Sequence, residues 1–199
     1  MIKRTFDFVA AALGLFLFSP LIAGAAMAIK LDSPGPVIFR QQRMGRNFRP
    51  FYIYKFRTMS VNAGGGELTV GADPRITWVG RFLRRTKLDE LPQLFNILLG
   101  DMSFVGPRPE VPLYVQLFHL DYEELLKVRP GLTDLASLKY RNESALLARS
   151  QNPEAEYIQH VLPDKIGLSK EYIRRSSFSY DLILICETVW QIWTPRRIA

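Results

Sequence analysis

The stretch Arg81-Phe-Leu-Arg-Arg-Thr-Lys-Leu-Asp-Glu-Leu-Pro-Gln93 is the part of the chain from which the fold can best be predicted. Residues 78–87 are typical of a short basic helix, and the apolar spacing over residues 91–99 predicts a second, amphipathic helix. Asp89 and Glu90 lie where the two helices meet. We therefore expect two helices joined at a pair of carboxylates. Four cations precede this pair: Arg81, Arg84, Arg85 and Lys87.

Two interpretations of the acidic pair are open at this point. In the simpler one, Asp89 caps the second helix and Glu90 is an acid in its first turn. In the other, one carboxylate attacks phosphorus to give an acyl phosphate, and its neighbour holds Mg²⁺, which bridges phosphate oxygens. Adjacent side chains point in different directions on a helix, so two separate roles are expected rather than a shared proton. Local spacing alone favours capping.

Further basic residues fit a phosphate site. Arg108 lies between two prolines, which restrict the backbone and would hold a guanidinium fork for bidentate phosphate contact. Lys55 and Arg57 alternate with aromatic residues, so they are expected on one face of a strand, facing either pyrophosphate or solvent. Arg129 precedes Pro-Gly in a weaker version of the stiff loop at Arg108. Each of these residues also has the simpler interpretation of a surface charge.

The N-terminal segment 8–29 contains 22 uncharged residues, which is long enough for a membrane helix. Ser19-Pro20 lies at its centre, where proline predicts a kink or break. The Ser19 hydroxyl is a candidate to satisfy the backbone group that Pro20 leaves without a partner.

Three interpretations of this segment remain: a spanning helix, a cleaved signal peptide ending at Ala26-Met27-Ala28, and a re-entrant hairpin. A spanning helix normally has its positive charge on one flank, whereas here Lys and Arg occur on both. This distribution suits two cytoplasmic ends. The residues alone do not decide among the three.

Composition indicates one globular domain with a modest core, since 48% of the 199 residues are hydrophobic and 23% are charged. The net charge of +7 lies entirely in residues 1–110, which hold 15 Lys and Arg against 8 Asp and Glu. Residues 111–199 hold 11 of each. A basic surface beside a membrane segment favours anionic lipid head groups or nucleotide phosphates. No nucleic-acid partner is expected, since no helix-turn-helix, RRM-like or zinc-finger pattern occurs.

Cysteine and histidine are scarce. Cys186 is the only cysteine, which excludes an intramolecular disulfide and favours a reducing compartment. His119 and His160 have no Cys or His partner at ligand spacing, so a histidine-based metal site is not expected.

The remaining pattern predicts an α+β fold that is mainly helical with short strands. Strands are expected at 37–39 and 51–57, a flexible loop at 62–71, and stiff turns at 106–109 and 129–131. A helix is expected over 111–128 and partial helix over 152–168. The helix at 111–128 is expected to face inward with four leucines: Leu113, Leu117, Leu120 and Leu125. A closing helix over 180–193 is either core or interfacial, because tryptophans precede Arg196 and Arg197.

Six motifs carry a resemblance to a known family over nearly the whole chain. They are Ser33-Pro-Gly-Pro-Val-Ile-Phe39, Tyr54-Lys-Phe-Arg-Thr-Met59, Asp73-Pro-Arg-Ile-Thr77, Leu88-Asp-Glu-Leu-Pro-Gln-Leu-Phe-Asn96, Gly100-Asp-Met-Ser-Phe-Val-Gly-Pro-Arg-Pro109 and Arg129-Pro-Gly-Leu-Thr133. On these the chain resembles the bacterial monotopic phosphoglycosyl transferases, also called the bacterial sugar transferase family. It looks like the short form, which lacks the extra N-terminal membrane domain of larger relatives.

The resemblance implies a location and a reaction. Residues 1–31 would form a re-entrant membrane helix broken at Ser19 and Pro20, and residues 32–199 a catalytic domain at the cytoplasmic face of the bacterial inner membrane. A sugar 1-phosphate would pass from a UDP-sugar to polyprenol phosphate, and UMP would leave. The partners implied are thus a UDP-sugar, polyprenol phosphate and membrane lipid; a homodimer is also considered.

The resemblance also implies roles for individual residues. Asp89 would be the nucleophile of a covalent phosphosugar intermediate, and Glu90 would help bind Mg²⁺. Five basic residues would bind phosphates: Lys55, Arg57, Arg85, Arg108 and Arg129.

One departure concerns Asp134, where the family often has glycine; an acid there would alter the nucleotide or sugar pocket. Two rival hypotheses are a non-catalytic membrane scaffold that binds anionic lipid, and a secreted protein with a cleaved leader.

Overall fold

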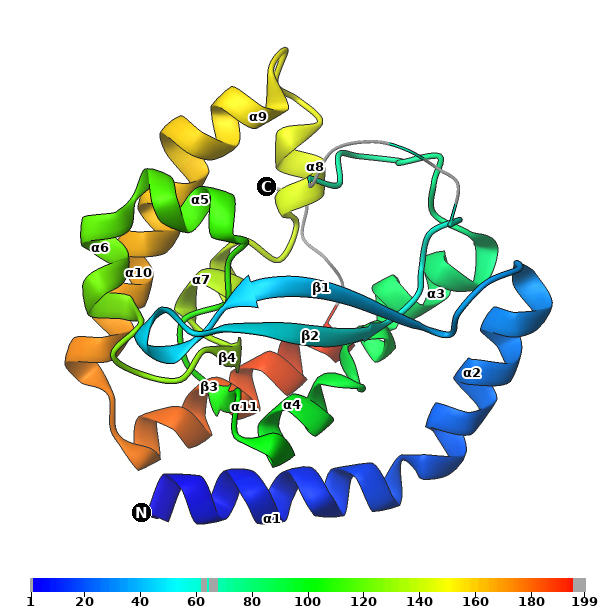
Figure 1. Cartoon of the computed structure of the whole chain (residues 1–199), viewed down its shortest axis with the longest axis horizontal. Coiled ribbons are helices and arrows are strands. Elements are labelled where there is room, and N and C mark those ends of the chain that lie inside the picture. The colour runs from blue at the N-terminus through cyan, green and yellow to red at the C-terminus, as the bar shows by residue number, and fades with distance from the viewer. Residues whose placement is uncertain (1, 62–63, 65–67, 195–199) are drawn as a thin grey trace.

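An antiparallel hairpin of β1 (Ile38–Met44) and β2 (Pro50–Phe56) lies across the middle of the molecule (Figure 1). The computed structural model describes residues 2–61, 64 and 68–194. Phe51 and Ile53 of β2 are buried and alternate with exposed neighbours, as expected for a strand with one face on a core. The strand predicted at 51–57 is confirmed, and the short one at 37–39 extends to Met44 because the whole hairpin pairs.

The two helices predicted around the acidic pair are confirmed as α3 (Trp78–Thr86) and α4 (Gln93–Leu99). A 3-10 turn, Leu88–Glu90, connects them. Lys87 adopts the left-handed conformation, with φ of 60°, and so turns the chain from α3 into this acidic turn. The hairpin and these helices share two clusters of buried apolar side chains, one of which includes Phe51, Ile53, Leu94 and Ile97.

The N-terminal segment forms two helices, α1 (Ile2–Leu17) and α2 (Ser19–Asp32), bent by 60°. Over the described ranges no single helix has the length and apolarity to cross a bilayer, although the bent pair taken together does. The break falls where Ser19-Pro20 predicted it. Proline has no N–H for the carbonyl of Phe16, and the Ser19 hydroxyl donates to that oxygen at 2.8 Å instead. The predicted role of this hydroxyl is confirmed.

Polar residues at the start of α1 bind the rest of the protein. The Lys3 ammonium donates to Val105 O at 2.8 Å and to Asp181 Oδ2 at 2.6 Å. Arg4 donates to two carbonyls at the end of α4, and the buried Asp7 accepts from Phe104 N. Lys3 and Arg4, which form the basic flank before the apolar segment, therefore make internal contacts as well.

A second, parallel pair of strands joins β3 (Ser103–Val105) to β4 (Gly131–Thr133), and the sequence pattern did not predict it. It depends on glycine, because a Cβ placed on Gly131 would lie only 2.1 Å from the backbone nitrogen of Gly106. The two predicted stiff turns, at 106–109 and 129–131, are thereby brought side by side.

The helix expected over 111–128 is broken at Phe118 into α5 (Pro112–Leu117) and α6 (His119–Leu125). The predicted inward face is wrong for three leucines and right for one: Leu113, Leu117 and Leu120 are exposed, whereas Leu125 is buried. Tyr114, Val115 and Tyr122 form the inward face instead. The prediction assumed one continuous helix, and the break at Phe118 changes which residues on either side of it face the core.

Helices complete the fold, so the predicted α+β, mainly helical class is confirmed. The partly helical segment at 152–168 and the closing helix at 180–193 are both present and begin or end a few residues away from the predicted positions. The further elements are the 3-10 turn Arg46–Phe48, α7 (Leu135–Lys139), α8 (Glu143–Leu147), α9 (Pro153–Glu156), the π-helical turn Tyr157–Val161, α10 (Leu162–Arg175) and α11 (Phe178–Trp193).

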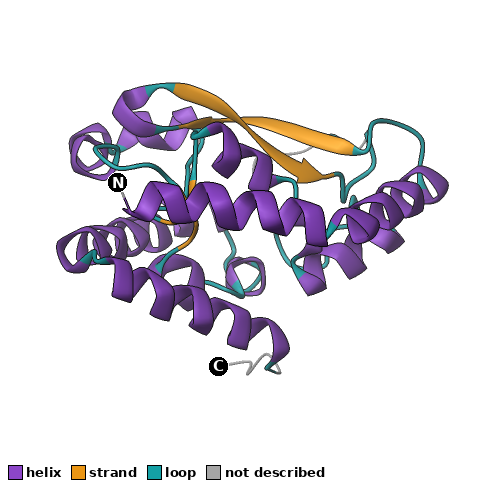
Figure 2. Cartoon of the chain, turned by 90° about the horizontal axis from the view of Figure 1, so that it is seen from below, coloured by secondary structure: helices purple, strands orange, loops and turns teal. Residues whose placement is uncertain are grey.

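Apolar side chains are exposed along α1 and α11, and Figure 2 shows both helices on the face seen from below. On α11, Leu182, Val189 and Trp190 are exposed, Trp190 by 70%, so these three are not core. This favours the interfacial interpretation of α11. Arg196 and Arg197, and part of the loop expected at 62–71, lie outside the described residues.

Exchange of Lys3 for Met should lower the free energy of unfolding by about 1–3 kcal/mol, because it leaves the buried Asp181 carboxylate without its ammonium partner. Chemical unfolding in detergent micelles measures this. Arg174→Gln, at an exposed position, is the control and should change stability by less than about 0.5 kcal/mol. Equal effects of the two exchanges would show that α1 is not anchored by Lys3.

Candidate active site

Asp89 and Glu90 do not cap α4. They lie in the 3-10 turn before it, and the N-cap position belongs to Pro92, which offers no side-chain hydrogen bond. The capping interpretation is therefore wrong. Asp89 is 8% exposed, and its Oδ1 atom has no hydrogen-bond partner among the described residues. A buried acceptor without a partner is costly and unusual, which marks Asp89 as a candidate functional group.

Glu90 lies at the centre of an ion cluster. Its Oε1 atom accepts from Arg108 Nη2 at 2.5 Å and from Lys55 Nζ at 3.1 Å. Two residues distant in sequence, Lys55 and Arg108, both of them predicted phosphate ligands, are thus brought together around the Glu90 carboxylate. Oε1 takes both bonds, and no hydrogen bond of Oε2 to a described residue is found.

Asn96 of α4 positions Lys55. The Asn96 Nδ2 atom donates to Tyr52 O at 2.8 Å, and Tyr54 N donates to Asn96 Oδ1 at 3.0 Å. The side-chain amide thus takes the place of a neighbouring strand on the free edge of β2. Since Asn96 follows the acidic turn on the same helix, this pairing sets Lys55 opposite Glu90.

Asp134 positions Arg108. One of its carboxylate oxygens accepts from Ser137 N at 2.8 Å and caps α7, and the other accepts from Ser169 Oγ at 3.1 Å and from Arg108 N at 3.4 Å. The Arg108 guanidinium also donates to Leu132 O. Asp134 is fully buried and, through these bonds, holds the Arg108 loop.

The cluster keeps Glu90 ionised. Burial would raise the pKa of Glu90, but Arg108 and Lys55 outweigh it and hold the pKa of this carboxyl well below its ordinary value. Attraction to Glu90 raises the pKa of Arg108 in turn. Burial lowers the pKa of the Lys55 ammonium, although Glu90 acts against this.

Asp89 behaves in the opposite way. Burial raises the pKa of Asp89, and repulsion from Glu90 raises it further, whereas Lys55 and other cations act against the rise. A carboxylate with a raised pKa and little solvation is the better nucleophile of the two. Two adjacent acids in unlike environments are thus suited to two different roles.

Three of the predicted phosphate ligands lie outside the ion cluster around Glu90. Arg57 is buried and donates to Ser33 O, Ser33 Oγ and Pro34 O, so that it holds the turn after α2. Arg129 donates to Gly100 O and lines a separate pocket. The Arg85 side chain is exposed and makes no hydrogen bond or ion pair with the described part of the chain.

Arg84 is a site residue that the sequence interpretation passed over in favour of Arg85. It donates to Thr58 Oγ1 at 2.8 Å, and burial lowers its pKa, an effect that nearby Asp89 opposes. The sequence does not distinguish the two arginines. Only the packing of α3 does so, because the Arg84 side chain is partly buried and bonded to Thr58 whereas Arg85 is exposed.

Over the described residues, no three His, Cys, Asp or Glu side chains come together as a ready metal site. Asp89 and Glu90 are adjacent carboxylates in the turn before α4. In proteins, Mg²⁺ usually takes one or two carboxylates and completes its shell with water and substrate phosphates.

The chain is similar to a known family and to several characterised proteins. Residues 1–195 match the family model described as bacterial sugar transferase. A UDP-glucose:undecaprenyl-phosphate glucose-1-phosphate transferase of Caulobacter vibrioides is 40% identical over 96% of this chain and 70% of its own length. The transferase of the same name from Escherichia coli (strain K12) is 39% identical over 96% of this chain.

A third relative, from Aeromonas hydrophila, is a UDP-N-acetylgalactosamine-undecaprenyl-phosphate N-acetylgalactosaminephosphotransferase, 38% identical over 97% of this chain. The chain spans only 40% of the length of the Escherichia coli relative and 44% of the Aeromonas relative.

Exchange of Arg108 for Gln should lower the free energy of unfolding by about 3 kcal/mol at neutral pH, because Glu90 keeps a buried charge with one partner fewer. Without Arg108 the pKa of Glu90 should rise, so that mild acid protonates it and relieves the penalty. The loss relative to wild type should therefore be smaller at about pH 5 than at about pH 7.

The control is the double exchange Glu90→Gln with Arg108→Gln, which removes both charges and should cost less than Arg108→Gln alone. Chemical unfolding at the two pH values measures all three. A loss that is independent of pH, and equal in the single and double variants, would contradict the ion pair.

Proposed function

The chain belongs to the bacterial sugar transferase family, and on that premise we propose that it transfers a sugar 1-phosphate from a UDP-sugar to a polyprenol phosphate, undecaprenyl phosphate in its named relatives. The products are UMP and a polyprenol-diphosphate sugar. The observation that carries the proposal is a buried, unpartnered Asp89 oxygen beside a Glu90 held by Lys55 and Arg108.

In the first half-reaction, an Asp89 oxygen attacks the phosphorus that bears the sugar. The bond from this phosphorus to the bridging oxygen breaks, its electron pair leaves with UMP, and the phosphosugar remains on the carboxylate. In the second, an oxygen of polyprenol phosphate attacks the same phosphorus, and the bond to Asp89 breaks. The carboxylate is regenerated, so the kinetics should be ping-pong.

Basic side chains supply the electrostatic part of this chemistry. Lys55 and Arg108 hold Glu90 in place, and their remaining N–H groups are suited to the charge on the phosphoryl oxygens. Arg84, close enough to influence Asp89, adds positive charge on the side of α3. Because the surroundings are largely buried, these charges act more strongly than they would in water.

Glu90 is the proposed ligand for Mg²⁺, and Asp89 lies next to it. Asp89 Oδ1 is buried without a hydrogen-bond partner among the described residues, and both hydrogen bonds of the Glu90 side chain fall on Oε1, so that Oε2 is left for a hard cation. When bound, the ion would neutralise charge on the phosphates of the substrate.

The bent pair α1 and α2 is proposed to enter the cytoplasmic face of the bacterial inner membrane and to leave by the same face. The 60° bend at Ser19-Pro20, the exposed apolar side chains and the hydroxyl that satisfies Phe16 O support this. The relatives are named for glucose and for N-acetylgalactosamine, so release of UMP across a panel of UDP-sugars is the measurement that identifies the sugar.

Wild-type protein incubated with its UDP-sugar alone should gain the mass of one phosphosugar and release one UMP. Asp89→Asn should abolish both and reduce turnover by at least about 1,000-fold, because an amide is a poor nucleophile. Asp121→Asn, a matched exchange at a surface ion pair, should leave turnover unchanged. Near-normal turnover by Asp89→Asn would exclude Asp89 as the nucleophile, and absence of UMP with every sugar nucleotide would favour the scaffold hypothesis.

Removal of divalent ions with a chelator should stop formation of the phosphosugar adduct, and added Mg²⁺ should restore it. Glu90→Gln should require at least about tenfold more Mg²⁺ for the same rate, since one anionic oxygen ligand is lost. Circular dichroism of the variant checks its fold. An adduct that forms equally well with and without the chelator would show that Mg²⁺ is not needed.

A further inference from the structure

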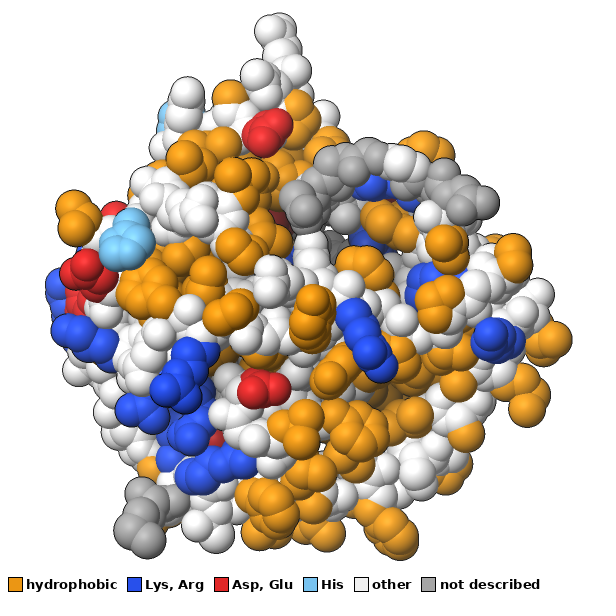
Figure 3. Space-filling view, in the orientation of Figure 1, with side chains coloured by type: hydrophobic (Ala, Val, Ile, Leu, Met, Phe, Trp, Pro, Cys, Tyr) orange, Lys and Arg blue, Asp and Glu red, His pale blue; other side chains and the backbone are white. Residues whose placement is uncertain are grey.

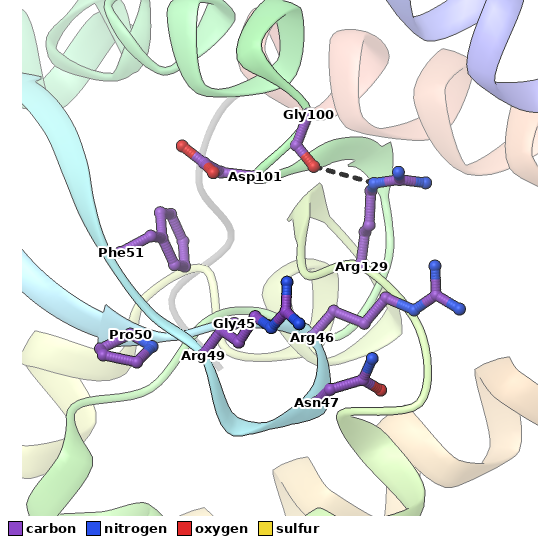
Figure 4. A pocket seen from close by; sticks show the side chains of 9 residues that line it. All are labelled: Gly45, Arg46, Asn47, Arg49, Pro50, Phe51, Gly100, Asp101 and Arg129. Carbon is purple, nitrogen blue, oxygen red and sulfur yellow. Dashed lines mark hydrogen bonds between the residues drawn. The ribbon is translucent and has the colours of Figure 1, made fainter.

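A basic pocket of about 280 Å³ lies at the turn of the β1–β2 hairpin, apart from the acidic turn. The hairpin turn, the residues after α4 and the loop before β4 form it, as Figure 4 shows. Its lining residues are Gly45, Arg46, Asn47, Arg49, Pro50, Phe51, Gly100, Asp101 and Arg129. None of the residues of the Glu90 cluster is among them.

The three arginines present unused donors. Arg46 Nε donates to Lys127 O at 3.0 Å and Arg129 Nε to Gly100 O at 2.8 Å. These bonds fix the two side chains while their terminal Nη groups bond to no described residue. Arg49 has no described side-chain hydrogen bond, and Figure 4 shows it directed into the space between the walls.

Asp101 is the one acid in this lining, so the pocket carries a net charge of about +2. Figure 4 shows its carboxylate directed away from Arg46 and Arg129, and no ion pair joins it to them. The arginine side chains are therefore available to an external anion. A guanidinium fork matches the oxygens of a phosphate ester in particular.

The pocket is separate from the proposed site of chemistry. Phe51 lines it, whereas Lys55 lies four residues further along β2, which is about 13 Å in an extended strand. A phosphate held by the arginines would therefore be too far from Asp89 to be attacked there. Binding in this pocket is not a step of the proposed reaction.

The pocket borders the surface proposed to meet the membrane. Gly100 and Asp101 follow directly after Leu99, which is 68% exposed at the end of α4. Arg4, at the start of α1, donates to carbonyls of the same helix end. In Figure 3 the cluster of basic side chains at lower left adjoins the apolar surface along the bottom of the view.

We propose that this pocket binds the phosphate of an anionic membrane lipid head group. A soluble phosphate ester has the same chemistry, but the adjoining apolar surface provides a place for acyl chains and favours the lipid. The inference uses the membrane placement proposed above and does not depend on Asp89 as nucleophile. Bound lipid would fix the hairpin turn against the bilayer.

Native mass spectrometry of the full chain in mixed micelles tests this, with phosphatidylglycerol compared with phosphatidylcholine of the same acyl chains. Wild type should retain phosphatidylglycerol preferentially, and Arg46→Gln with Arg49→Gln should reduce this retention about 30-fold, given the contribution of two arginines near an anionic surface. The control, Arg40→Gln with Arg174→Gln, removes the same charge outside the pocket and should retain the lipid.

Equal retention of phosphatidylglycerol by wild type and the pocket variant would overturn the proposal, as would equal retention of the two lipids by wild type. Calorimetric titration with inorganic phosphate is the second arm. Phosphate binding that depends on the arginines, without preferential lipid retention, would assign the pocket to a soluble ligand and overturn the lipid assignment.

Should the double variant not fold, Arg49→Gln alone should reduce retention about fivefold. Loss of the phosphosugar adduct is measured separately, so the two proposals fail independently.

Discussion

The side-chain amide of Asn96 on the free edge of β2 is the contact on which the geometry of the site depends. A two-stranded hairpin is marginally stable alone and needs another element to hold it. Here α4 supplies apolar packing, and its Asn96 pairs with the backbone as a strand would. Because the same helix follows the acidic turn, one amide fixes both the hairpin and the separation of Lys55 from Glu90.

The loop that carries Arg108 is supported by a second set of buried polar contacts. Asp134, Ser137 and Ser169 form one layer beneath it. Glu110 forms another, accepting from Arg43, Tyr157 and the backbone of Val111. Satisfied networks of this kind hold a side chain in one geometry, so the guanidinium at Glu90 is positioned by residues that do not contact the acidic pair.

The sequence predicted those helices and strands whose signal lies within a short stretch of residues. Apolar periodicity predicted the helices around the acidic pair and helix α11. Aromatic content predicted strand β2, and a proline predicted the break at Ser19-Pro20. The β3–β4 pair could not be predicted, because three-residue strands have no period and their pairing depends on two glycines distant in sequence. The site shows the same limit of local patterns. Lys55 and Arg108 were predicted as phosphate ligands from their sequence neighbours. Arg84 and Asn96 were not predicted, because their roles depend on tertiary packing.

Attachment of α1 to the rest of the fold has a consequence for the proposed placement at a bilayer. Ala11 is fully buried against the hairpin and α4, and Lys3, Arg4 and Asp7 are bonded to α4, β3, α10 and α11. Helix α1 is thus packed into the fold and is not a flexible tether. In the membrane placement proposed above, the fold would set the immersion depth, so that a thicker or thinner bilayer would deform around the protein instead of tilting the helix.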